Sequence, residues 1–174
     1  VDLAAKLSGW TLDGLLQRKE AKSRAAWSAF TGYLAIDRSA LPDDGPLFHQ
    51  VLQSYDSPIC EGNNVLISLS PPGDASYGPP EVRVATLSTH TKADGWIGLD
   101  KPAHALKKAD YAERLLGAVH RALPDAAEAL VHSEFATPRS FARYTRRVDG
   151  LVGGPPVARS NSNLFSVGAD LLGK

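Results

Sequence analysis

The segment W-S-A-F-T-G-Y-L-A-I-D, Trp27–Asp37, decides which fold class this sequence predicts. It has no charged residue before its last position and is rich in aromatic and β-branched side chains, which is typical of a buried β-strand. Turn-forming residues fill positions 41–46, and positions 47–53 can form a second strand. We therefore expect these two strands to pair as a hairpin.

Three further segments have the composition of strands, at positions 65–69, 82–89 and 129–136. Apolar and polar residues alternate in the last two, as they do in a strand with one buried face. Turns rich in proline and glycine separate the first four strands. The pattern predicts a mostly antiparallel sheet.

Two helices are expected beside this sheet. Apolar residues recur at helical spacing from Tyr111 to Leu123, with Asp110 as the expected N-cap and Pro124 as the stop. A second, shorter helix is expected to begin after Thr137, which precedes a proline. The predicted fold class is α+β, a mostly antiparallel sheet of about five strands with helices packed on one face.

The length of 174 residues predicts a single domain. Within it we expect a helical lead-in at 1–24, the sheet and its helix at 25–136, and a short helix with a glycine-rich tail at 137–174. The sequence contains no methionine, so we expect either a processed N-terminus or a piece of a longer protein.

Composition narrows the class of partner and compartment. The 19 basic and 19 acidic residues cancel, so no overall field attracts the chain to nucleic acid, and no nucleic-acid partner is expected. The single cysteine, Cys60, and the lack of a signal-peptide pattern favour the cytoplasm.

Four arginines lie at positions 139, 143, 146 and 147. A solvated face explains them best, and peripheral contact with anionic membrane headgroups stays open as an alternative.

Common catalytic motifs do not occur in the sequence. It has no G-x-G-x-x-G, no phosphate-binding P-loop, no G-x-S-x-G and no H-E-x-x-H, so neither a catalytic residue nor a metal site is predicted. The string G-L-V-G-G, with Gly150, Gly153 and Gly154, has two interpretations. Its backbone either approaches something bulky closely, or Gly150 simply ends the preceding helix.

Three blocks of sequence resemble, in the same order, the FAD-dependent carotenoid desaturase and isomerase family, the phytoene dehydrogenase-related proteins. The strongest is A-T-P-R-S-F-A-R-Y-T-R-R-V-D-G-L-V-G-G-P-P at 136–156, and the others lie at 61–70 and 83–91. The resemblance covers about positions 27–164. The flavin-binding blocks at the two ends of family members have no counterpart here, so the resemblance implies a substrate-side fragment of a larger flavoprotein that is not active alone.

The resemblance implies that the parent is an oxidoreductase that desaturates or isomerises an apolar polyene. FAD is expected in the parent and none is expected on this fragment. An uncovered sheet face would form the floor of a substrate tunnel, and the glycine loop would face the cofactor. The implied substrate-binding residues are Phe30, Tyr33, Leu34, Leu66 and Leu87, and the implied cofactor-facing residues are Gly150, Gly153 and Gly154.

Two interpretations remain open besides a substrate-side fragment of a flavoprotein. One is a free-standing isoprenoid- or lipid-binding module that works without flavin, and another is an unrelated interaction domain. Whether this chain is itself an enzyme stays open. As partners we expect the polyene and the remainder of the flavoprotein, together with self-association through exposed apolar surface.

Overall fold

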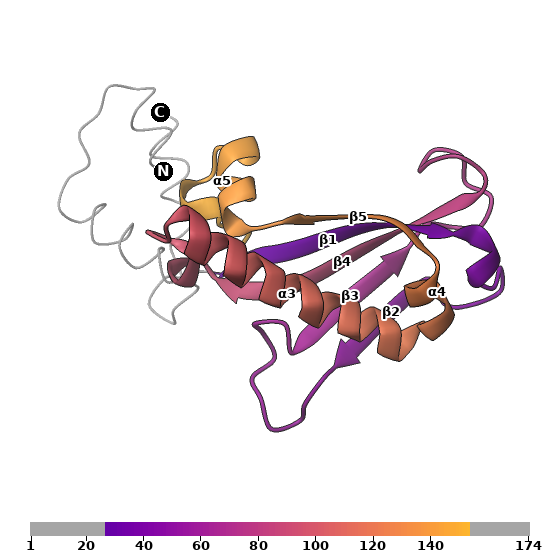
Figure 1. Ribbon diagram of the computed structural model, residues 1–174, viewed down its shortest axis with the longest axis horizontal. Coiled ribbons are helices and arrows are strands. Elements are labelled where there is room, and N and C mark those ends of the chain that lie inside the picture. Colours follow the sequence, from indigo (N-terminus) through magenta and orange to yellow (C-terminus); the bar gives the residue numbers. More distant parts are fainter. Residues whose placement is uncertain (1–26, 154–174) are drawn as a thin grey trace, which may run out of the picture. The chain divides into compact units, whose positions relative to one another are not determined.

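The computed structural model describes residues 27–153, and Trp27–Val152 form one compact unit. Its architecture is α+β, a five-stranded antiparallel sheet with helices, which confirms the predicted fold class (Figure 1). The helical lead-in expected at 1–24 and most of the glycine-rich tail, including Gly154, lie outside the described residues. No helix within the described part is long and apolar enough to cross a membrane.

The sheet has the order β2-β3-β4-β1-β5, and all neighbouring strands are antiparallel. Its strands are β1 (Trp27–Asp37), β2 (Phe48–Leu52), β3 (Asn64–Leu69), β4 (Val82–Lys92) and β5 (Leu130–Ala136). The α-helices are α3 (Lys101–Ala122), α4 (Pro124–Glu128) and α5 (Pro138–Thr145). Single 3₁₀ turns are η1 (Arg38–Ala40), η2 (Ala93–Trp96) and η3 (Val148–Gly150).

The expected hairpin between the first two strands is wrong. β1 pairs with β4 and β5, whereas β2 pairs with β3 at the edge of the sheet. The physical reason lies in the two sequences. The uncharged apolar run of β1 suits the interior of the sheet, where both edges of the strand are paired, while the short β2 carries His49 and Gln50 and suits an edge.

The long helix begins ten residues earlier than expected. Asp100, rather than Asp110, is its N-cap, because the Asp100 side chain accepts a hydrogen bond of 2.8 Å from the backbone N–H of Ala103. Asp110 instead lies within α3 and forms an ion pair with Arg114. The shorter helix α5 begins as expected, with a capping box between Thr137 and Ser140.

The core lies between one face of the sheet and α3, which Figure 1 shows running across the strands. Because side chains alternate along a strand, every second residue of β1, β3 and β4 faces α3. The fully buried core side chains include Phe30, Leu34, Ile36, Val65, Ile67, Leu87, Leu115 and Val119. No α-helix of comparable length covers the opposite face within the described residues, and we call that side the open face.

Candidate functional site

The open face is formed by the alternate residues that point away from α3. Large apolar side chains on it are partly exposed: Phe48 is 68% exposed, Tyr33 44%, Leu66 43% and Trp27 40%. Directly paired residues of antiparallel strands project to the same side, so the strand register orders these side chains into rows. One row is Phe48, Ser68, Thr86, Tyr33 and Glu134, and the next is Gln50, Leu66, Ser88, Thr31 and Ala136.

The structure places the five predicted substrate-binding residues on two sides of the sheet. Tyr33 and Leu66 lie on the open face. Phe30, Leu34 and Leu87 are at most 1% exposed and belong to the core beneath α3. The five therefore do not share one surface, because residues of opposite parity on a strand project to opposite faces.

The fold of this chain requires a glycine at position 150. Its φ is +69°, and a Cβ atom there would lie 1.9 Å from the carbonyl oxygen of Pro138. Its own carbonyl accepts a hydrogen bond of 2.6 Å from the Ser28 hydroxyl. The interpretation as the C′ residue of the preceding helix is wrong, because Arg146 takes the left-handed position after α5. Gly153 is exposed.

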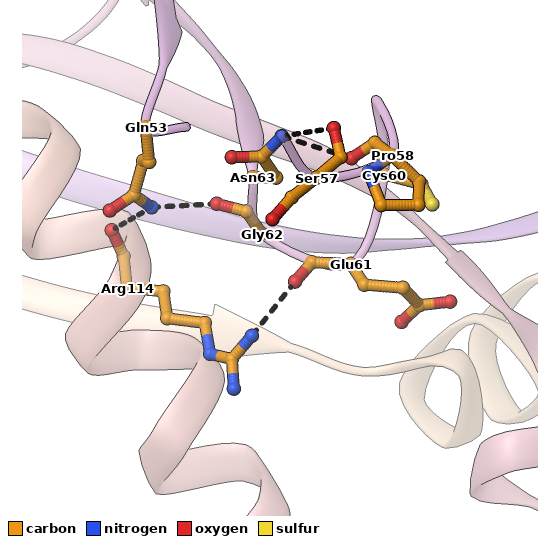
Figure 2. Close-up of a pocket in the computed structure, with 8 residues that line it drawn as sticks. All are labelled: Gln53, Ser57, Pro58, Cys60, Glu61, Gly62, Asn63 and Arg114. Carbon is orange, nitrogen blue, oxygen red and sulfur yellow. Dashed lines mark hydrogen bonds between the residues drawn. The ribbon is translucent and has the colours of Figure 1, made fainter. Parts of the chain in front are cut away.

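A hollow of about 380 Å³ lies between α3 and the loop before β3, and the sequence did not point to it (Figure 2). Its lining residues are Gln53, Ser57, Pro58, Cys60, Glu61, Gly62, Asn63 and Arg114. The Gln53 side-chain amide donates to the carbonyl of Gly62 at 2.6 Å. The Asn63 amide donates to three backbone carbonyls of the same loop. These amide donors are satisfied within the chain, which gives the loop a fixed shape.

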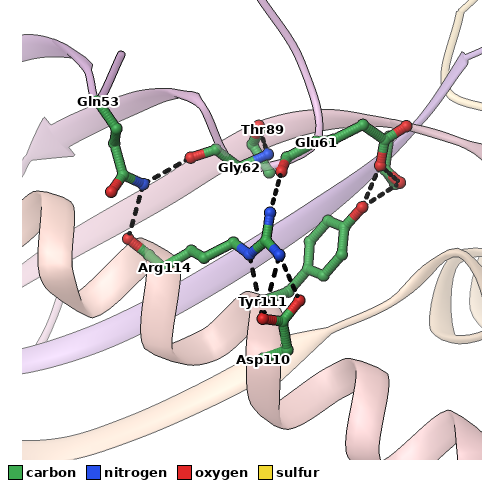
Figure 3. A network of polar contacts seen from close by, with 8 residues as sticks. Gln53, Glu61, Gly62, Thr89, Asp110, Tyr111 and Arg114 are labelled. Atoms are coloured by element: carbon green, nitrogen blue, oxygen red, sulfur yellow. Dashed lines mark hydrogen bonds and ion pairs between the residues drawn. The ribbon is translucent and has the colours of Figure 1, made fainter. Parts of the chain in front are cut away.

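Glu61 ties this loop to β4 and α3 (Figure 3). Its carboxylate accepts hydrogen bonds from the Tyr111 hydroxyl, the Thr91 hydroxyl at 2.7 Å and the backbone N–H of Lys92 at 2.8 Å. Burial raises the pKa of Glu61, but these hydrogen bonds and the charge of Lys107 outweigh it and hold the pKa below its usual value. Burial and the bond to Glu61 raise the pKa of Tyr111.

The neighbouring Gly62 brings the loop close to α3. It adopts a φ of +84°, and a Cβ atom there would lie 2.8 Å from the Arg114 Cδ atom. The Arg114 guanidinium donates to the Glu61 carbonyl at 3.2 Å and pairs with Asp110 at 3.0 Å. The hydrogen bonds of Glu61, Gln53 and Arg114 join the loop to β4 and α3, so the cluster acts as a clamp that fixes the loop.

No protein-family model matches the chain. It is 25% identical over 126 residues to prolycopene isomerase, chloroplastic, of Arabidopsis thaliana, covering 71% of this chain and 21% of that protein. It is 24% identical over 126 residues to the protein of the same name from Daucus carota, covering 71% and 20%.

The chain spans about a fifth of the length of the curated relatives that it matches. Over that span it is distantly homologous to a carotenoid isomerase, which supports the family indicated by the sequence blocks at the level of an oxidoreductase-related domain.

Proposed function

We propose that this chain is the substrate-binding part of a FAD-dependent oxidoreductase that desaturates or isomerises a carotenoid, and that the open face of the sheet holds the polyene. The observation that carries the proposal is the set of exposed apolar side chains on this face, Trp27, Tyr33, Phe48 and Leu66, in a chain distantly homologous to prolycopene isomerases. The core beneath α3 has no room for a ligand, because its side chains are fully buried against one another.

The open face suits one side of a long apolar rod. Phe48, Leu66 and Tyr33 come from three different strands, so they offer contact across the sheet rather than at one isolated point. When a ligand covers such side chains, each Å² of apolar surface removed from water contributes about 25 cal/mol of favourable free energy to binding. The role proposed for these residues is to bind and orient the polyene and to exclude water from it.

The described residues contain no glycine-rich turn from a strand into a helix, which is the usual cradle for the dinucleotide pyrophosphate. Gly150, one of the three glycines expected to face the flavin, packs closely against the backbone of Pro138 in α5. The FAD of the proposed parent enzyme would therefore be held by residues outside the described part of the chain, and we assign no reaction step to the residues described.

A carotenoid titration tests the proposal. The full chain is titrated with lycopene dispersed in detergent micelles, and binding is read from tryptophan fluorescence quenching and the shift of the lycopene absorption band. Leu66→Asp places a charge on the open face and should weaken binding at least about tenfold. The matched control is Leu106→Asp, because Leu106 is 74% exposed on α3. Equal affinities of the two variants, or no binding by the wild-type chain, would refute the proposal.

A further inference from the structure

The centre of the open face is polar rather than apolar. Four hydroxyl side chains from the three inner strands meet there: Ser68 pairs with Thr86, and Ser88 pairs with Thr31. Thr86 and Ser88 are two residues apart on β4, so the two pairs lie in adjacent rows. We call these four residues the hydroxyl patch. Leu66 adjoins the patch on one side, and Tyr33 on the other.

Thr31 is the unusual member of the hydroxyl patch. The residue is only 8% exposed, and its Oγ1 atom is buried without any hydrogen-bond partner. Other buried hydroxyls in the described residues do have partners. Ser28 donates to the Gly150 carbonyl, Thr89 accepts from the Gly62 N–H, and Ser70 accepts from the Val84 N–H.

An orphaned hydroxyl destabilises the folded chain, because it gives up its bonds to water and gains none in return. Valine has the same shape and an equal preference for strands, and would avoid that cost. Thr31 lies in the interior of the sheet and is paired with Ser88 on one side and Ala136 on the other. Its backbone N–H and C=O groups therefore belong to the pairing of the strands. No described residue provides a hydrogen-bond partner for its Oγ1 atom, which is the exception among buried hydroxyls.

Resting on the proposed function, we propose that the ligand of the open face is an oxygenated isoprenoid, and that the hydroxyl patch binds its hydroxyl or carbonyl group through Thr31 and Ser88. Ser88 is partly exposed and lies beside Thr31, so it meets the ligand oxygen first. Since the Thr31 Oγ1 atom is buried in the free chain, this assignment requires side chains of the open face to move aside when the ligand binds. The flanking apolar side chains, Leu66 and Phe48, then bind the hydrocarbon part.

A matched pair of pigments tests this assignment. β-Carotene and zeaxanthin have the same conjugated chain, and only zeaxanthin carries hydroxyl groups, so the optical readout of binding is the same for both. The wild-type chain should bind zeaxanthin about tenfold more tightly than β-carotene. Thr31→Val should remove this preference without changing the affinity for β-carotene, and Thr31→Ser should retain it.

The outcomes separate this inference from the function on which it rests. Equal binding of the two pigments by the wild-type chain, or a preference for zeaxanthin that survives in Thr31→Val, overturns the role of the hydroxyl patch and leaves the carotenoid site intact. Failure of both pigments to bind overturns the proposed function and this inference with it. Thermal unfolding of Thr31→Val checks that the variant folds, and its melting temperature should equal or exceed that of the wild type because an unpaired polar atom is removed.

Discussion

The Tyr111 hydroxyl donates a hydrogen bond to the Glu61 carboxylate and thereby joins the middle of α3 to the loop that precedes β3. Thr91 of β4 donates to the same carboxylate and also accepts a hydrogen bond of 3.0 Å from the Trp96 indole. One carboxylate therefore connects a loop, a strand and a helix behind the sheet. This clamp fixes the covered side of the sheet.

Glu61→Gln should destabilise the chain in a pH-dependent manner. The pKa of Glu61 is lowered in the folded state, so its ionised form stabilises the fold fully at pH values above its unfolded pKa. That stabilisation is lost as the pH falls through the lower, folded-state pKa. At pH 7 we expect a loss of about 1–3 kcal/mol in the free energy of unfolding from urea titration.

The control for this prediction is the same urea titration repeated at decreasing pH. The difference between wild type and Glu61→Gln should shrink as the pH falls from the unfolded pKa of a glutamate through the lower, folded-state pKa, below which both side chains are neutral. A difference that stays constant with pH would show that the ionised carboxylate is not the stabilising form.

Gly62→Ala should destabilise the loop clamp. The variant combines the cost of a positive φ with a Cβ contact of 2.8 Å to the Arg114 side chain. Gly73→Ala is the matched control, since Gly73 also has a positive φ, of +73°, but has open space around it. We expect a loss of about 1 kcal/mol for Gly73→Ala and about 1 kcal/mol more for Gly62→Ala in chemical denaturation. Equal losses would contradict the close approach of the loop to α3.

Gly150→Ala tests whether this glycine serves the fold. A Cβ atom there would collide with backbone atoms of Pro138, which cannot move aside as a flexible side chain can. We expect the chain itself to lose about 3 kcal/mol or more of stability. Gly78→Ala, at a position with open space and no positive φ, should change stability little. An unchanged melting temperature for Gly150→Ala would instead favour a role toward an external group.

We propose that copies of this chain associate with one another through the exposed apolar side chains of the open face. Phe48 is 68% exposed on the edge strand β2. Phe48→Glu should lower the association constant measured by sedimentation equilibrium at least about fivefold, because a charge at an apolar contact is costly to bury. A wild-type chain that stays monomeric at high concentration would contradict this prediction.

Local sequence patterns predicted the helices and strands of this fold better than they predicted which strands pair with each other. Composition predicted β1 and alternation predicted β4 and β5, but the pairing of β1 with β4 joins segments far apart in the sequence, which no local pattern encodes. The start of α3 was missed for a physical reason. Its first half is largely exposed, with Leu106 at 74%, so the apolar periodicity begins only at Tyr111.

The candidate site was predicted only in part for the same reasons. Composition identified apolar residues of the sheet, but strand alternation already puts the neighbours Tyr33 and Leu34 on opposite faces. The strand register was needed only to put Leu66 on the same face as Tyr33. The bond between Glu61 and Tyr111 spans fifty positions of sequence and has no motif. In the sequence Thr31 is an ordinary strand residue, and only the structure shows that its hydroxyl has no hydrogen-bond partner.

The most direct measurement of the central claim is a methyl-resolved NMR titration of the full chain with a carotenoid in micelles. Leucine methyl groups report on each surface separately, because Leu66 lies on the open face, Leu106 is exposed on α3 and Leu87 is buried in the core. The account predicts saturable shifts and direct contacts to polyene protons at the Leu66 methyl groups, with Leu106 unchanged. Contacts at Leu106 in place of Leu66, or no saturable shift at Leu66, would contradict it.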